Sequence, residues 1–333
     1  MQLNNLNLKQ KISQMFITGF DGTLPDNNFI NLVKSGLGGV IFFTRNIKTK
    51  NQFKNLISEI KKEALIPMFF SIDQEGGRVE RTENIHGGKK YLSAKHAFEK
   101  GLKYLEEQTG QIAAELKSYG INMNFAPVLD VNTNIKNPII GERAFSNKTE
   151  DVIKAAKVVL KEYEKHRIIT VGKHFPGHGG ASTDSHKTLP VIDLSNEELK
   201  ENHIKPFIEA IKFGCPAIMA AHVLYPKLDD SNTPASVSEK IIKELLINEI
   251  GFSGIVITDD MEMNGIKNYT RIEACIKAIN AGVNMFIFRD TTKEIIELID
   301  NLEKAVRCNH ISENSIDISF EKIIKLKTLY NLM

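Results

Sequence analysis

Eight short apolar runs alternate along the chain with longer amphipathic stretches, and this alternation limits the fold more than any other feature. Most of the runs are apolar at nearly every position, as expected for parallel strands in a sheet that is covered on both faces. The runs occupy residues 14–19, 39–44, 67–72, 122–128, 168–172, 216–221, 254–258 and 283–288. Repeated strand and helix units of this kind predict an α/β fold.

Amphipathic, helix-like stretches separate the runs, for example at residues 48–64, 94–119, 149–166, 195–213 and 238–249. Eight strands with intervening helices predict a closed (β/α)8 TIM barrel, and a doubly wound open sheet is the alternative. The 333 residues suit one barrel, and the sequence contains no internal repeat, low-complexity tract or flexible linker. We therefore expect residues 1–333 to form a single barrel domain, in which the helices after residue 292 are closing elements.

Composition excludes several functional classes. The formal charge is +2, from 43 basic and 41 acidic residues, so no overall field favours nucleic acid or an anionic membrane surface. Cys215, Cys275 and Cys308 are too widely spaced for a disulfide framework or a cysteine zinc site. The N-terminus does not resemble a secretory signal, and no run reaches the ~20 apolar residues of a membrane span. We therefore expect a soluble, cytoplasmic monomer that binds neither nucleic acid nor membranes.

Ionisable residues follow six of the predicted strands. In α/β barrels the residues just after the strands meet at one face, where active sites are found. These residues are Asp73, Asp130, Lys173 with His174, His222, Asp259 with Asp260, and Arg289 with Asp290. The sequence therefore predicts one polar site at the C-terminal ends of the strands.

The segment from Lys173 to His186 concentrates the residues that are able to do chemistry, including three of the nine histidines. Asp184 lies two residues before His186, close enough in a turn to orient the imidazole and stabilise its charge. This is the arrangement of an acid/base histidine. An Asx-turn beside a solvated histidine has the same spacing. The neighbouring Lys173, His174 and His178 favour the catalytic interpretation.

Asp259 directly follows the predicted strand 254–258, which would hold its carboxylate rigidly at the rim of the barrel. A carboxylate in this position suits a nucleophile. Aspartate is also favoured as a helix N-cap, and a helix could begin at Asp260 or Met261. Two consecutive aspartates allow one to cap such a helix while the other reacts.

His174, His178 and His186 also suit a zinc site by number and type. Pro176 opposes the helix that normally places a histidine pair four residues apart on one face. The first predicted strand also lacks the His-x-His pattern that is usual in barrel metallohydrolases. We therefore expect neither a metal nor another cofactor.

Several further polar residues suit substrate binding. Asp73, Arg78, Arg143 and Lys173 offer the directed donors and acceptors that sugars and other polyols require, although each singly also fits a structural salt bridge. The pair Gly76-Gly77 predicts a tight turn rather than a phosphate-binding loop, because the full phosphate-loop spacing is absent.

The segment Lys173-His-Phe-Pro-Gly-His-Gly179, followed by Asp184-Ser-His186, resembles the signature of the β-N-acetylhexosaminidases of glycoside hydrolase family 3. The resemblance extends over nearly the whole chain. Further segments that resemble the family, in the family's order, are residues 72–79, 124–130, 141–145, 218–223, 234–238 and 254–260.

The resemblance implies a retaining, two-step mechanism. Asp259 would attack the anomeric carbon, and His186, paired with Asp184, would protonate the departing oxygen and then activate water. The general two-carboxylate template would thus have a histidine as its acid. The resemblance also implies a set of substrate-binding residues for a terminal N-acetylglucosamine, namely Asp73, Arg143, Lys173 and His174, with Arg78, His178 and His222 around them.

The substrates that the resemblance implies are peptidoglycan fragments, with N-acetylglucosamine β-linked to anhydro-N-acetylmuramic acid, met during cytoplasmic wall recycling. Two alternatives remain open. A phosphorylase fits because a histidine acid/base does not repel phosphate, and a non-catalytic glycan-binding barrel is the other. Two features depart from the family pattern: Asn284, where members often carry Asp, and the loop at residues 85–90, which is expected to alter the rim that meets the leaving sugar or peptide.

Overall fold

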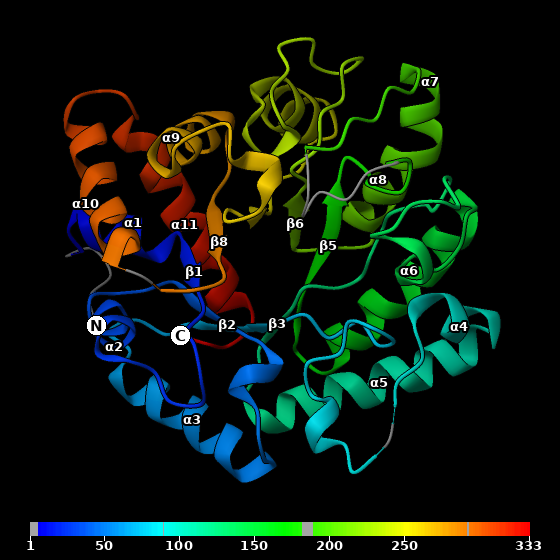
Figure 1. Cartoon of the computed structure of the whole chain (residues 1–333), viewed down its shortest axis with the longest axis horizontal. Coiled ribbons are helices and arrows are strands. Elements are labelled where there is room, and N and C mark those ends of the chain that lie inside the picture. Colours follow the sequence, from blue (N-terminus) through cyan, green and yellow to red (C-terminus); the bar gives the residue numbers. More distant parts are fainter. Residues whose placement is uncertain (1–5, 89, 182–188, 292) are drawn as a thin grey trace.

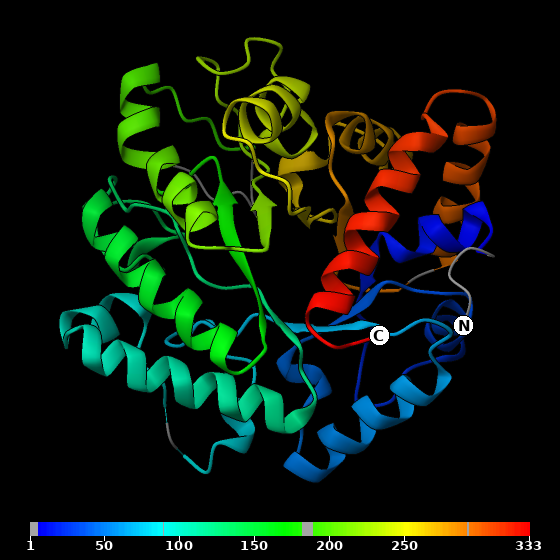
Figure 2. The same ribbon diagram turned by 180° about the vertical axis from the view of Figure 1, so that it is seen from behind.

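The computed structural model describes residues 6–88, 90–181, 189–291 and 293–333, which form a closed barrel of eight parallel strands (Figures 1 and 2). The strands are β1 (Phe16–Thr18), β2 (Gly39–Phe42), β3 (Phe69–Ile72), β4 (Met123–Asn124), β5 (Ile169–Phe175), β6 (Ala217–Ala220), β7 (Ile255–Asp260) and β8 (Met285–Phe288). They follow one another in chain order, and β8 pairs with β1 to close the barrel. The prediction of a (β/α)8 TIM barrel is confirmed, and the open sheet is wrong.

Each predicted apolar run overlaps one strand, but β4 is much shorter than its run, and β5 and β7 extend beyond theirs. β4 pairs over only two residues of the run 122–128, because the N–H of Ala126 turns back to the carbonyl of Asn124 and Pro127 has no N–H to donate to a ladder. β5 and β7 run further than predicted, so Lys173, His174, Asp259 and Asp260 lie on the strands themselves. Their backbones are therefore fixed by the barrel rather than by a loop.

Helices surround the barrel, as Figures 1 and 2 show. They are α1 (Leu8–Gln14), α2 (Asn27–Lys34), α3 (Lys50–Glu63), α4 (Ala94–Glu99), α5 (Leu102–Tyr119), α6 (Thr149–Lys165), α7 (Asn196–Glu198), α8 (Lys205–Lys212), α9 (Arg271–Ala281), α10 (Lys293–Arg307) and α11 (Glu313–Leu329). Leu199–Ile204 and Lys240–Glu249 are π-helical. The stretch 94–119, predicted as one helix, is divided between α4 and α5 because Gly101 has a φ of 102°. No helix in the described ranges is both long and apolar enough to cross a bilayer.

Apolar side chains from every strand belong to one hydrophobic core. At the closure between β1 and β8, the ring of Phe16 lies 5.5 Å from that of Phe286 and 5.7 Å from that of Phe288, centroid to centroid. The last two helices belong to the same body, since α1 packs against both α10 and α11. Lys11 of α1 also forms a 2.6 Å ion pair with Asp317 of α11.

Asn284, which departs from the family pattern, has a structural role between β7 and α11. Its buried side chain accepts a hydrogen bond from the backbone N–H of Val256 at 2.9 Å and donates one to the hydroxyl of Ser319 at 3.1 Å. An ionised aspartate at this position would have no proton to donate to Ser319. The amide therefore matches its present neighbours.

Lys327, near the end of α11, is buried in the core at 0% exposure. Its ammonium group lies 2.6 Å from the amide oxygen of Gln14 and 4.9 Å from the ring centroid of Phe69. Gln14 precedes β1 and Phe69 begins β3, so this lysine lies at the N-terminal ends of the strands, opposite the predicted site. Burial lowers the pKa of Lys327 to about 7, because the charged form loses its hydration.

Replacing Lys327 by Met is expected to raise the free energy of unfolding at pH 7, by about 1–2 kcal/mol. Between pH 7 and 10.5 the unfolded lysine binds a proton that the folded lysine has lost, so wild-type stability rises with pH across this range. The variant loses this rise. Urea unfolding at pH 7 and pH 9.5 measures both effects, with the exposed Lys325→Met on the same helix as control. A Lys327→Met variant that is less stable than wild type at both pH values contradicts the prediction.

Candidate active site

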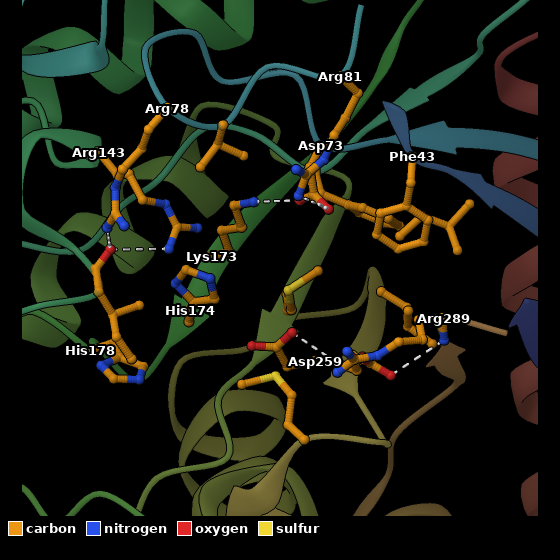
Figure 3. Close-up of a pocket in the computed structure, with 18 of the residues that line it drawn as sticks. Phe43, Asp73, Arg78, Arg81, Arg143, Lys173, His174, His178, Asp259 and Arg289 are labelled. Atoms are coloured by element: carbon orange, nitrogen blue, oxygen red, sulfur yellow. Dashed lines mark hydrogen bonds and ion pairs between the residues drawn. The ribbon is translucent and has the colours of Figure 1, made fainter. Parts of the chain in front are cut away.

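A cavity of about 420 Å³ opens at the C-terminal ends of the strands (Figure 3). Most of the predicted site residues line it, namely Asp73, Arg78, Arg143, Lys173, His174, His178 and Asp259. They come from strands or loops that are far apart in the sequence, and the closure of the barrel brings them together. The sequence did not single out Phe43, Arg45 and Arg81, which also line the cavity.

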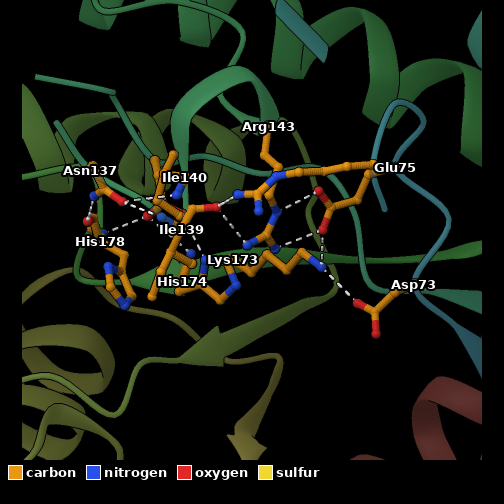
Figure 4. Close-up of polar contacts among 12 residues, drawn as sticks. Asp73, Glu75, Asn137, Ile139, Ile140, Arg143, Lys173, His174 and His178 are labelled. Atoms are coloured by element: carbon orange, nitrogen blue, oxygen red, sulfur yellow. Dashed lines mark hydrogen bonds and ion pairs between the residues drawn. The ribbon is translucent and has the colours of Figure 1, made fainter. Parts of the chain in front are cut away.

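Lys173, only 2% exposed, is the centre of an ion-pair network on one wall of the cavity (Figure 4). Its ammonium group lies 2.7 Å from Asp73 Oδ1 and 2.5 Å from Glu75 Oε1. Glu75 in turn accepts two hydrogen bonds from Arg143, at 2.8 and 2.9 Å. One buried carboxylate therefore fixes both cations.

Glu75 was not predicted as a site residue, although it lies within the segment that follows β3. Its spacing from Asp73 could have revealed it as a site residue, because residues two apart in an extended chain point to the same side. Burial alone would raise the pKa of Glu75, but Arg143 and Lys173 outweigh it and hold the pKa well below its usual range. Glu75 is therefore a permanent anion that orients Lys173 and Arg143.

His174 is oriented by Asp130, which is completely buried. Asp130 Oδ2 lies 2.7 Å from His174 Nδ1, while its Oδ1 accepts the backbone N–H groups of His178 at 2.6 Å and His174 at 3.3 Å. Burial alone would raise the pKa of Asp130, but His174 and the N–H of His178 lower it. The ionised carboxylate fixes the proton on Nδ1 and leaves Nε2 of His174 for a ligand.

His178 is buried in the wall beside His174, with the two ring centroids 5.9 Å apart. Neither of its ring nitrogens has a hydrogen-bond partner among the described residues. Burial and the neighbouring His174 lower the pKa of His178 to about 4, so the ring is neutral at pH 7. A neutral imidazole both donates and accepts, as a sugar hydroxyl requires.

Asp259 lies in the part of the cavity between His174 and Arg289 (Figure 3). Its Oδ1 accepts the backbone N–H of Asp260 at 2.8 Å, which limits rotation of the carboxylate. Burial would raise the pKa of Asp259, but His174, His222 and Lys173 outweigh it and lower the pKa. Asp259 is therefore ionised at neutral pH and has the charge that a nucleophile needs.

Asp260 does not cap a helix, so that part of the sequence interpretation is wrong. β7 runs through Asp260, and the described chain continues in a turn instead of a helix. The carboxylate accepts the backbone N–H of Glu262 at 3.1 Å and pairs with the guanidinium of Arg289 at 2.6 Å. Asp260 therefore joins the end of β7 to the residue that follows β8.

His222 does not line the cavity in the described part of the chain. Its Nε2 donates to the backbone carbonyl of Asp260 at 3.1 Å, so its Nδ1 accepts from the hydroxyl of Ser236 at 2.6 Å. His222 was expected among the substrate-binding residues; here it supports the backbone beside Asp259 from behind.

Arg78 and Arg143 both bind the loop between β4 and α6. Arg78 donates to the carbonyl of Ile139, and Arg143 donates to the same oxygen at 3.4 Å. Gly76 and Gly77 have positive φ, and Gly76 pairs with Val79, so the predicted tight turn is confirmed. The turn reverses the chain direction, so the side chain of Arg78 lies at the cavity.

Some predicted features lie outside the cavity or outside the described residues. Asp184 and His186 fall in the range 182–188, which is not described. In the loop at 85–90, the described residues do not line the cavity, and the buried side chain of His86 lies 2.7 Å from Glu80 and 3.3 Å from Glu115. Within the described ranges, no three His, Cys, Asp or Glu side chains gather as metal ligands.

Replacing Glu75 by Gln is expected to lower the free energy of unfolding at pH 7 by about 3 kcal/mol, because Lys173 and Arg143 would lose their shared anion. The folded pKa of Glu75 lies below its unfolded value of about 4.5. The stabilisation is therefore full above pH 4.5 and lost as pH falls through the folded pKa. The measurement is urea unfolding at pH 7 and pH 4.

The matched control is Glu262→Gln, which removes a partly exposed pair with Arg271 and should cost less than about 1 kcal/mol. Equal losses in the two variants would refute the structural role assigned to Glu75.

Comparison with known proteins agrees with this fold. Residues 7–326 match the glycosyl hydrolase family 3 N-terminal domain. Beta-hexosaminidase A of Pseudoalteromonas piscicida is 33% identical over 92% of this chain, and a beta-hexosaminidase of Methylobacillus flagellatus is 32% identical over 83%. A family 3 beta-N-acetylglucosaminidase from Paenibacillus sp. str. FPU-7 superposes with a TM-score of 0.93, at 35% identity over 98% of this chain.

The match covers different shares of these proteins. This chain spans 56% of the Pseudoalteromonas protein and 63% of the Paenibacillus chain, but 80% of the Methylobacillus protein. The family model covers almost all of this chain, and the Paenibacillus chain shares its fold. The chain therefore belongs to glycosyl hydrolase family 3.

Proposed function

We propose that this protein is a retaining exo-β-N-acetylglucosaminidase that removes terminal N-acetylglucosamine from peptidoglycan fragments. The observation that carries the proposal is Asp259, an ionised carboxylate held at a strand end inside a cavity rich in hydrogen-bonding groups. The names of the relatives support the same activity, because they are beta-hexosaminidases and a beta-N-acetylglucosaminidase.

The wall around Lys173 suits the terminal sugar. Asp73 accepts hydrogen bonds, Lys173 donates them, and His174 offers the ring nitrogen that Asp130 leaves free. Neighbouring hydroxyls of a pyranose need such alternating donors and acceptors at fixed positions. Because Glu75 fixes Lys173 and Arg143, this wall is arranged before the sugar arrives, which lowers the cost of binding.

In the first step, an oxygen of Asp259 bonds to the anomeric carbon while the bond from that carbon to the leaving oxygen breaks. His186, oriented by Asp184, gives its proton to the leaving oxygen. In the second step His186 takes a proton from water, the water oxygen attacks the anomeric carbon, and Asp259 leaves as a carboxylate. The lowered pKa of Asp259 favours this departure, since it stabilises the carboxylate that is released.

The proposed substrates carry N-acetylglucosamine β-linked to a muramic acid residue, and the proposed setting is wall recycling in the cytoplasm by a monomer. The cavity of about 420 Å³ is of the size that holds a small ligand. It suits removal of one terminal sugar.

Asp259→Ala is expected to lower kcat/KM for p-nitrophenyl N-acetyl-β-glucosaminide by roughly 1,000-fold or more, because no other group replaces the nucleophile. The exposed Asp230→Ala, remote from the cavity, is the control. Wild type should release free N-acetylglucosamine in phosphate buffer as well as without phosphate. Full activity of Asp259→Ala would refute the nucleophile, and N-acetylglucosamine 1-phosphate as the product would refute hydrolysis.

His186→Gly is expected to lower kcat/KM by roughly 100- to 10,000-fold for leaving groups of high pKa, which depend on a proton donor. The loss should be smallest for nitrophenolates, which depart without protonation. A series of aryl N-acetyl-β-glucosaminides measures this as a steeper dependence of log kcat/KM on the pKa of the leaving phenol. Equal losses across the series would contradict the acid role.

A further inference from the structure

The loop between β4 and α6 (residues 125–148) lies between two parts of the site (Figure 4). On one side, its Ile139 carbonyl accepts hydrogen bonds from two arginines that line the cavity. On the other side, it contacts residues 177–181, which precede Asp184 and His186 in the chain. This loop therefore connects the wall of the cavity to the segment that comes before the proposed proton donor.

Asn137 binds both sides with one amide group, and Figure 4 shows it beside Ile139, Ile140 and His178. Its Oδ1 accepts the backbone N–H groups of Ile139 and Ile140, each at 2.9 Å. Its Nδ2 donates to the backbone carbonyl of His178, also at 2.9 Å. Asn137 is only 5% exposed, so the loss of one of these bonds would leave a buried polar group without its partner. The amide thus fixes the backbone of His178 against the loop.

Asn134 has the same arrangement three residues earlier. Its Oδ1 accepts the backbone N–H of Lys136 at 3.0 Å, and its Nδ2 donates to the backbone carbonyl of Ala181 at 3.0 Å. Its own backbone N–H donates to the carbonyl of Gly179 at 3.3 Å. In both asparagines the oxygen holds the loop and the NH₂ group holds residues 177–181. A carboxylate could do only the first, because it has no N–H to donate.

The loop and residues 177–181 also pack directly, backbone against backbone. A Cβ at Gly179 would overlap the carbonyl oxygen of Val131, so this close approach requires glycine. At the start of the segment, the carbonyl of Gly177 accepts a hydrogen bond from the hydroxyl of the buried Tyr225 at 3.0 Å. The segment is therefore held at both of its ends and in its middle.

The proposed nucleophile has a separate support. Asp259 lies on β7, and its carboxylate is held by the backbone N–H of Asp260. Neither Asn134 nor Asn137 is among the described residues that line the cavity. A change in the two asparagines should therefore leave the nucleophile in place.

We propose that Asn134 and Asn137 are positioning residues for proton transfer. By holding residues 177–181, they fix the point from which the chain continues toward His186. A proton donor must lie within hydrogen-bond reach of the leaving oxygen, and a displacement of about 1 Å can lower a rate by about 100-fold. This role rests on the proposed function, in which His186 is the acid.

Asn137→Asp and Asn134→Asp test the role, because each keeps the accepting oxygen and loses the bond donated to residues 177–181. Each is expected to lower kcat/KM by about 10- to 100-fold for aryl N-acetyl-β-glucosaminides whose phenols have a high pKa. For the 2,4-dinitrophenyl substrate, which needs no proton, the loss should be below about 2-fold. The inhibition constant of N-acetylglucosamine should change by less than about 2-fold, because the sugar wall is intact.

Asn280→Asp is the matched control. Asn280, near the end of α9, donates to the backbone carbonyl of His310, and it is not among the described residues that line the cavity. This variant should leave the whole substrate series unchanged. Circular dichroism verifies folding, and if Asn137→Asp fails to fold, Asn134→Asp provides the same test.

A double variant separates positioning from a general structural effect. In the His186→Gly background, Asn137→Asp is expected to cause less than about 2-fold further loss, because the donor that it positions is gone. A loss of the same size in both backgrounds would overturn the proposal. Equal losses across the substrate series, or wild-type activity of both asparagine variants, would also overturn it.

The same series distinguishes this proposal from the proposed function. If His186→Gly steepens the dependence on the pKa of the leaving phenol and the asparagine variants do not, only the role of the asparagines is overturned. If wild type hydrolyses none of these substrates, or His186→Gly loses activity equally across the series, the proposed function is refuted and the role of the asparagines is refuted with it.

Discussion

The carboxylate of Glu75, shared between Lys173 and Arg143, is the interaction on which the rest of the site depends. It holds side by side two cations that would otherwise repel each other. The Glu75 side chain is only 3% exposed. A buried anion of this kind is stable only because both partners satisfy it. The same network fixes Asp73 through Lys173, so three groups of the proposed sugar site share one point of attachment.

A second buried carboxylate, Asp130, does for His174 what Glu75 does for Lys173. The parallel strands place both anions on the same side of the barrel, because the segments after β3, β4 and β5 are neighbours there. His174, the backbone N–H of Asp260 and Lys173 then lower the pKa of Asp259 against the effect of burial. The barrel therefore provides a nucleophile that is ionised and a polar wall that is arranged in advance.

Much of the fold could be predicted from the sequence. Each of the eight apolar runs overlaps a strand, and most of the polar residues that follow them line one cavity. The prediction failed where local rules compete with tertiary contacts. Aspartate is a common helix cap, but the carboxylate of Asp260 forms an ion pair with Arg289, which follows the neighbouring strand β8. Likewise, His222 lies at a strand end, yet its hydrogen bond to the Asp260 carbonyl turns it away from the cavity.

The sequence by itself determined the strand and helix periodicity, the family, and which residues follow each strand, because these are properties of neighbours along the chain. Only the tertiary structure decided which charges meet. Glu75 contacts Arg143 across 68 positions of the chain and Lys173 across 98. The energy of an ion pair depends on the distance between the two charges in the closed barrel, and the local sequence does not contain that distance.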